Sequence, residues 1–168
     1  MGEGKEIQSI QKKESAMKLE IELVPQTLFE QNLRSLLTKK QWDKVRRTAY
    51  AEYGNQCAIC GGHGNKHPVE AHELWVYDDV IRTQTLQEVV AVCPLCHKAL
   101  HIGRSMSVLN TSELVKLEAH MAKLLPHKDL LAVVKHALQV WNMRNQFVWQ
   151  QKIPDEVKIG TQMFNLNG

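Results

Sequence analysis

All four cysteines of the chain fall in residues 57–101, where they form two CxxC pairs about 30 residues apart. Two thiolates on one tight turn can reach the same soft cation, and two such pairs complete a tetrahedral shell of four sulfurs. Four protein ligands leave no open coordination position, so such a metal holds structure and does no chemistry. The spacing therefore predicts a structural zinc site formed by Cys57, Cys60, Cys93 and Cys96.

Three histidines lie close to these cysteines in the sequence. His72 stands between the two pairs, flanked by Glu70 and Glu73, and His97 and His101 directly follow the second pair. Side chains four residues apart on a helix share one face, so the last two histidines can bind the same metal ion or phosphate group. Imidazole also exchanges a proton near neutral pH, which suits acid–base catalysis. These residues suggest a second, open metal site beside the closed one.

Hydrophobic patterning predicts the elements that must position these side chains. Residues 69–76 and 89–92 read as strands, and a helix is expected to begin at the second cysteine pair. Pro94 falls near the first helical position, where its missing N–H costs nothing, and Gly103 is expected to end this helix. The predicted order is a cysteine knuckle, a strand, a loop, a strand and a helix.

Two elements are predicted before the cysteine centre. Residues 17–24 alternate as MKLEIELV, which indicates a short strand that Pro25 closes. Residues 26–37 read as a helix, because apolar residues recur there at steps of three and four. The apolar side of this helix is expected to consist of Phe29, Leu33, Leu36 and Leu37.

A further helix is predicted over residues 39–53, with Thr38 as its N-cap and Gly54 as its stop. At 100° per residue, one face of this helix carries the apolar residues and the opposite face carries basic ones. The basic stripe is either a solvated face or a set of phosphate contacts, so its members are candidate substrate-binding residues. The apolar face consists of Trp42, Val45, Ala49 and Tyr53, and the basic stripe of Lys40, Lys44 and Arg47.

The C-terminal third is predicted to be a helical hairpin followed by an irregular tail. Asn110 and Glu113 form the pattern of a capping box ahead of an amphipathic helix that Pro126 breaks. A second helix is expected over residues 129–147, and the chain from Ile153 onward reads as a tail. Three histidines of the hairpin have no other metal-ligating residue near them in the sequence and are expected to be surface or core histidines without a metal: His120, His127 and His136.

Composition and charge limit the class of protein. The net charge of +3 is mild, but residues 39–47 carry five Lys or Arg against one Asp, while the loop between the cysteine pairs is acidic. A basic periphery around an acidic, histidine-bearing centre suits a site that holds cations and receives a polyanion. No apolar run approaches the roughly 20 residues that span a bilayer, and the N-terminal stretch lacks a hydrophobic signal segment. We therefore expect a cytoplasmic protein with no membrane partner, whose cysteines bind metal rather than form disulfides.

The expected organisation is one domain with extensions, because 168 residues suit a single compact unit. Its zinc-binding core would lie between two mainly helical regions. The expected segments are a flexible tail over 1–16, a strand and helices over 17–56, the core over 57–103, a helical hairpin over 104–152 and a tail over 153–168.

Residues 57–101 resemble the HNH family of endonucleases, the His-Me finger proteins of treble-clef, ββα-metal type. The matching elements are CAIC, the histidine of VEAHE and the terminal CPLCHKALH, a stretch of 45 residues. The resemblance implies an α+β fold with a small zinc-stabilised treble-clef core, flanked by N-terminal and C-terminal helices. It also implies a metal-dependent endonuclease that hydrolyses phosphodiester bonds in DNA.

The resemblance implies a role for each residue that matches the motif. His72 would be the general base that takes a proton from the attacking water. His97 would ligate a catalytic divalent cation (magnesium, manganese or nickel) that polarises the scissile phosphate, and His101 would be a second ligand or a phosphate contact. Glu70 or Glu73 could orient His72 or complete the metal shell through water. The zinc held by the cysteines would only maintain the fold.

Two departures from the family pattern keep other functions open. Ala71 stands where many members have an Asp or His ligand, and Glu88 stands at the position of the middle Asn. A zinc-stabilised nucleic-acid-binding module without cleavage is therefore the second hypothesis. The third is a rubredoxin-like iron site for electron transfer, because CAICG and CPLC resemble rubredoxin hooks. Against it, His97 stands where rubredoxins carry Gly, and this chain is much longer.

Overall fold

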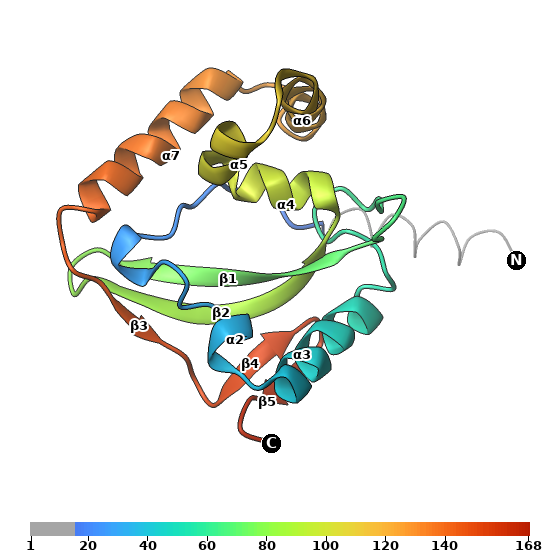
Figure 1. Ribbon diagram of the computed structural model, residues 1–168, viewed down its shortest axis with the longest axis vertical. Coiled ribbons are helices and arrows are strands. Elements are labelled where there is room, and N and C mark those ends of the chain that lie inside the picture. The colour runs from blue at the N-terminus through green and yellow to red at the C-terminus, as the bar shows by residue number, and fades with distance from the viewer. Residues whose placement is uncertain (1–15) are drawn as a thin grey trace, which may run out of the picture.

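A long antiparallel hairpin runs through the centre of the computed structural model, which describes residues 16–168 as a mixed α+β fold (Figure 1). The first strand of the hairpin lies at one edge of a five-stranded sheet, and the second strand also pairs in parallel with two short strands near the C-terminus. The strands are β1 (Glu70–Asp78), β2 (Thr83–Val92), β3 (Gln150–Lys152), β4 (Glu156–Ile159) and β5 (Gln162–Asn165).

Helices cover the hairpin from two sides (Figure 1). Four helices of the C-terminal half lie on one side, and one long N-terminal helix lies on the other together with β4 and β5. The first group contains α4 (Pro94–Leu100), α5 (Ile102–Val108), α6 (Thr111–Leu124) and α7 (Leu130–Arg144). The other helical segments are η1 (Gln26–Leu28), α2 (Leu33–Leu36) and the long helix α3 (Lys39–Glu52).

The two sides enclose two separate hydrophobic cores, and β2 contributes to both. Its side chains alternate between the faces of the sheet, so Val90 and Val92 pack with the cysteines, α4 and α6. Val89 points the other way, and a bulge at Gln87 puts Leu86 on the same face as Val89, so that both pack with α3 and β4. A strand buried on both faces reads as a nearly continuous apolar run, which explains the sequence LQEVVAV at its end.

The expectation of an irregular tail from Ile153 onward is wrong. Residues of β4 pair with β2, with Glu88 opposite Lys158 and Val89 opposite Ile159. Val157 and Ile159 are buried in the core beneath α3. Strands of four residues carry too little local pattern to be recognised, and their stability comes from pairing with a strand about 70 positions earlier.

The N-terminal predictions also need correction. Residues 17–24 are extended and bury Leu19, as their alternation indicates, but they form no strand in the described part of the chain. The helix expected over 26–37 is broken, because Glu30 adopts a left-handed conformation with φ of 66° between η1 and α2. Of its expected apolar side Leu33 is fully buried, while Phe29 and Leu36 are 53% and 55% exposed. Most of the tail expected over 1–16 lies outside the described residues.

Helix ends follow the sequence signals more closely. Thr38 and Asn110 each form a complete capping box, which satisfies backbone donors of the first turn of α3 and α6. Gly54 has a φ of 58° just after α3, the conformation expected of a terminating glycine. Gly103 does not end a helix; the break falls at His101, between α4 and α5. A short break in a helix at a polar residue such as His101 leaves a weaker signal in the sequence than a terminating glycine does.

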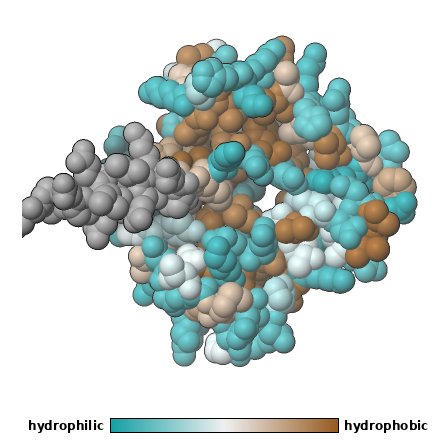
Figure 2. All heavy atoms as spheres, turned by 180° about the vertical axis from the view of Figure 1, so that it is seen from behind, coloured by the Kyte–Doolittle hydropathy of each residue, from teal (hydrophilic) through white to brown (hydrophobic). Residues whose placement is uncertain are grey.

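Apolar residues are also exposed on the surface. Figure 2 shows the face opposite to that of Figure 1, with apolar atoms gathered over the helical half and in a smaller area at one edge. Val80 and Ile81, in the turn between β1 and β2, are 90% and 60% exposed. Among residues 16–168, no helix combines the length and the apolar character that crossing a membrane requires.

Candidate metal centres and active site

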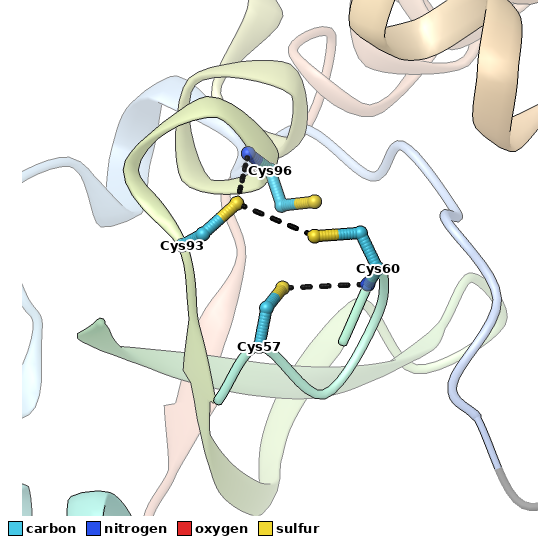
Figure 3. Close-up of side chains that lie close together, drawn as sticks. All are labelled: Cys57, Cys60, Cys93 and Cys96. Carbon is cyan, nitrogen blue, oxygen red and sulfur yellow. Dashed lines mark hydrogen bonds between the residues drawn. The ribbon is translucent and has the colours of Figure 1, made fainter. Parts of the chain in front are cut away.

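The four cysteines converge at one end of the hairpin (Figure 3). Cys57 and Cys60 lie on the knuckle that follows α3, and Cys93 and Cys96 lie at the start of α4. All four are free thiols, and the sulfurs of Cys60 and Cys93 are 3.6 Å apart. A tetrahedral zinc with bonds of about 2.3 Å to sulfur separates its ligands by about 3.8 Å. The cluster therefore has the composition and the spacing of a site that could bind zinc.

The backbone around the cluster is arranged to stabilise negative sulfur. The N–H groups of Ile59 and Cys60 donate to the sulfur of Cys57 at 3.4 and 3.5 Å, and the N–H of Gly62 donates to Cys60 at 3.4 Å. Gly61 has a φ of 73°, which allows the tight turn that aims these groups inward. Such N–H···S bonds support thiolates that ligate a metal.

Without a metal ion, the clustered thiols compete for protons. Hydrogen bonds from Cys93 and Cys96 lower the pKa of Cys57, so one thiolate is stabilised at the expense of its neighbours. The pKa of Cys93 is raised to about 11, above all because its thiol donates to Cys57. Four thiolates at this spacing would repel one another, whereas a divalent cation at their centre removes that cost.

His120 belongs to this centre, although the sequence predicted an ordinary histidine. It projects from α6, and its Nε2 lies 3.1 Å from the sulfur of Cys96. An imidazole N–H donating to a coordinated thiolate is an outer-shell interaction that tunes and positions the ligand. The 24 positions between the two residues have no motif spacing, so only the packing of α6 on α4 reveals this contact.

The histidines of the open site converge as the sequence suggested. His72 pairs across the hairpin with Val90, whose side chain faces the helical side, so His72 also points toward α4. His97 lies on α4, and His101 lies at its C-terminal end. Ring nitrogens of all three residues lie within 4.8 Å of one another, and their ring centroids are 4.8 to 5.3 Å apart. Small ring rotations would let all three nitrogens surround one ion.

Glu70 completes this cluster from β1, two residues before His72 and on the same face. Its Oε2 lies 2.5 Å from Nδ1 of His97, as in the carboxylate–histidine pairs that orient metal ligands. A hydrogen bond from Nδ1 leaves Nε2 of His97 available to an ion or a phosphate. Burial lowers the pKa of His72 well below its ordinary value, and partial desolvation together with the neighbouring His97 lowers that of His101, which stays partly exposed, to about 4. Both rings are therefore neutral at pH 7, the form that binds metal or accepts a proton.

The other two carboxylates considered for the site lie elsewhere. Glu73 pairs with Val89 and points to the opposite core, where its Oε1 accepts the N–H of Leu33 at 2.7 Å. Glu88 accepts the hydroxyl of Tyr53 at 3.0 Å and lies 3.4 Å from Nζ of Lys158. Because alternate residues of β1 face opposite sides, Glu70 and not Glu73 is the carboxylate beside the histidines.

A cleft of about 860 Å³ opens beside the histidine cluster. It is lined by α3 on one side, by α4 and α5 on the other, and by the beginning of β1. Its lining includes Glu70, His97 and His101 but not His72. The basic residues predicted to contact substrate, Lys40, Lys44 and Arg47, are exposed on α3 and do not line the cleft. Other cations do: Arg34, Lys39, Arg46, Lys98 and Arg104.

Comparisons with known protein families, curated proteins and solved structures found no match for this chain. The indications of its chemistry therefore lie in the geometry of its own residues. That geometry combines a four-thiol cluster that could hold zinc with an open cluster of three histidines and one carboxylate. A metal site with four protein ligands stabilises the fold. An open metal site beside a basic cleft can bind and activate an anionic ligand.

Proposed function

We propose that the chain is a metal-dependent endonuclease of HNH type that hydrolyses phosphodiester bonds in DNA. The observation that carries this proposal is the convergence of His72, His97 and His101 beside a basic cleft. The order of a cysteine knuckle, the β1–β2 hairpin and α4 supports a treble-clef core of the ββα-metal type. The four-cysteine cluster would hold a structural zinc that fixes α4 against the knuckle.

The catalytic divalent cation would be bound by His97 and His101, whose side chains line the cleft. When bound, such a cation polarises a phosphoryl oxygen and makes a nearby water a stronger acid. Glu70 would hold the ring of His97 in one tautomer, so that Nε2 stays aimed at the ion. Uncompensated cations of the cleft would hold the phosphodiester close to the histidines.

His72 has two possible roles in this proposal. The family resemblance implies that it is the general base; its lowered pKa keeps the ring neutral but also makes it a weaker base. It does not line the cleft, and its ring nitrogen lies within 4.8 Å of those of the two histidines that do, which suits a third metal ligand equally well. The two roles differ in whether loss of His72 removes the metal or only the proton transfer.

A binding module without cleavage is the second candidate function. Two observations favour it, both at positions that depart from the family pattern. Ala71 packs against the core beneath α3 and offers no ligand atom. Glu88 is engaged by Tyr53 and Lys158, so it does not replace the middle Asn of the motif. Such a module would still bind DNA with strong salt dependence.

Nicking of a supercoiled plasmid with magnesium, manganese or nickel tests the proposal. We expect the wild type to nick the plasmid and His97→Ala and His72→Ala to lose this activity while retaining one zinc per chain. His136→Ala, an exposed histidine of α7, is the matched control and should cleave normally. No cleavage by the folded, zinc-loaded wild type with any of the three metals would favour the binding module.

Calorimetric titration with nickel separates the two roles of His72. If His72 is a ligand, His72→Ala should weaken nickel binding at the open site as strongly as His97→Ala. If it is the base, nickel affinity should be retained while nicking is lost. Equal nicking by wild type and His72→Ala would contradict both roles.

A further inference from the structure

The residues that line the cleft beside the histidines come mainly from α3 and from α4–α5. These helices lie on opposite sides of the β1–β2 hairpin (Figure 1). One wall is a stripe along α3 that includes Lys39, Trp42, Arg46 and Tyr50. These residues recur at steps of three and four, so they share one face of the helix and run along about 16 Å of its length. The other wall carries Lys98 of α4 and belongs to the same helical segment as His97 and His101.

Positive charge in the cleft is largely uncompensated. Its lining holds five Lys or Arg residues against two carboxylates, of which Asp43 pairs with Arg46 at 2.7 Å and Glu70 contacts the ring of His97. The remaining cations form no ion pair with any residue of the described part of the chain. Cations without partners on both walls attract a phosphate backbone. These cations are Arg34, Lys39, Lys98 and Arg104.

The α3 wall also presents aromatic rings. Trp42 and Tyr50 are partly exposed and lie eight positions apart on the same stripe. Trp42 packs against the core beneath α3, which anchors its ring in place. A positively charged groove with aromatic side chains along it is the arrangement that binds single strands, because unpaired bases can stack on the rings. Paired bases keep their faces inside the duplex and cannot use them.

The size of the cleft favours the same substrate. The cleft has a volume of about 860 Å³, which is within the range of pockets that bind small molecules. It can therefore hold a few nucleotides at most. His97 and His101 line this half-open space between the two walls. A strand that must lie between α3 and α4–α5 to reach them enters more easily when it is unpaired.

We propose that this cleft binds an unpaired segment of DNA, with Tyr50 and Trp42 as stacking surfaces and Lys98 and Arg104 among its phosphate contacts. The inference deepens the proposed function and rests on it for the use of the histidines. It makes single-stranded or locally unpaired DNA the substrate, rather than uninterrupted duplex. It also transfers the binding role from the exposed stripe on the far face of α3 to the face that lines the cleft.

Binding without added divalent cation tests this inference independently of cleavage. Fluorescence anisotropy of the zinc-loaded protein should give at least tenfold tighter binding to a labelled single strand than to the duplex of the same sequence. Arg104→Ala and Lys98→Ala should each weaken single-strand binding and reduce its salt dependence. Lys116→Ala, an exposed helical lysine of α6, is the matched control and should bind as the wild type does.

Two substitutions of Tyr50 test whether its aromatic ring contributes to single-strand binding. Tyr50→Leu should weaken single-strand binding roughly five- to hundredfold, the range for removing one stacking ring. Tyr50→Phe keeps the ring and should bind nearly normally. If Tyr50→Leu proves unstable, the exposed Lys98 and Arg104 variants decide the question.

The outcomes separate this inference from the proposed function. Equal affinity for single strand and duplex, or single-strand binding unaffected by the Lys98, Arg104 and Tyr50 changes, would overturn it even if the protein cleaves DNA. Tight single-strand binding that depends on these residues, in a protein that cleaves nothing, would support it and refute the nuclease. Cleavage restricted to unpaired regions of a bubble or flap substrate would support both.

Discussion

The buried carboxyl group of Glu73 should make the stability of the protein depend on pH. Its carboxylate is enclosed between β1 and α2, where it accepts the N–H of Leu33 at 2.7 Å. Burial raises the pKa of Glu73 from its ordinary value of 4.5 to about 7, although the hydrogen bond from Leu33 opposes the rise. We expect the variant Glu73→Gln, which retains an oxygen acceptor but cannot ionise, to remove the pH dependence that this group imposes on folding.

Proton linkage determines whether Glu73 stabilises the protein at low or at high pH. The folded state binds the proton of Glu73 more tightly than the unfolded chain does, so its stabilising effect is complete below about pH 4.5 and is lost as the pH rises through about 7. At 1.36 kcal/mol per pKa unit, the shift corresponds to about 3 kcal/mol. Glu73→Gln should therefore gain stability over the wild type by about 2–3 kcal/mol when the pH is raised from 5 to 8.5.

Urea unfolding of the zinc-loaded proteins at several pH values between 5 and 8.5 measures this gain. The wild type and the variant share the same metal centres, so the pH dependence of those centres cancels in the difference between their unfolding free energies. Glu118→Gln, at an exposed position of α6, is the control and should differ from the wild type by a constant amount. A constant difference for Glu73→Gln as well would refute the assignment of a buried, protonated carboxyl.

Three further predictions concern the metal centre and the sheet. Removal of the metal with a strong chelator should release one zinc per chain from a colourless protein and abolish its helical circular dichroism signal, whereas a red protein would indicate iron. His120→Ala should lower zinc affinity by about 10- to 100-fold in competition with a chromophoric chelator, because it removes the contact of 3.1 Å to Cys96; His136→Ala should not. Gly160→Ala should lower the free energy of unfolding by about 1–3 kcal/mol, since φ is 60° there and an added Cβ would lie 2.6 Å from Oε2 of Glu52. An unchanged urea midpoint for this variant would mean that the β4–β5 turn relaxes without cost.

The sequence by itself determined the features that depend on close neighbours. Two CxxC pairs identify a four-thiol site, because the type and spacing of the ligands are visible without the fold. The four-residue step from His97 to His101 puts both on one helical side, and the capping boxes at Thr38 and Asn110 mark where helices begin. Each of these signals lies within a few positions of the chain, where helix geometry alone relates the side chains.

Only the tertiary structure decided which distant residues meet. The strand register turned Glu70 toward the histidines and Glu73 away from them, and the packing of α6 on α4 brought His120 to Cys96. Pairing with β2 places part of the C-terminal segment, which the sequence predicts to be irregular, in the sheet. The approach of α3 to α4–α5 determines which Lys and Arg residues line the cleft. Such contacts join positions tens of residues apart, so their energy comes from burial and pairing that local periodicity does not record.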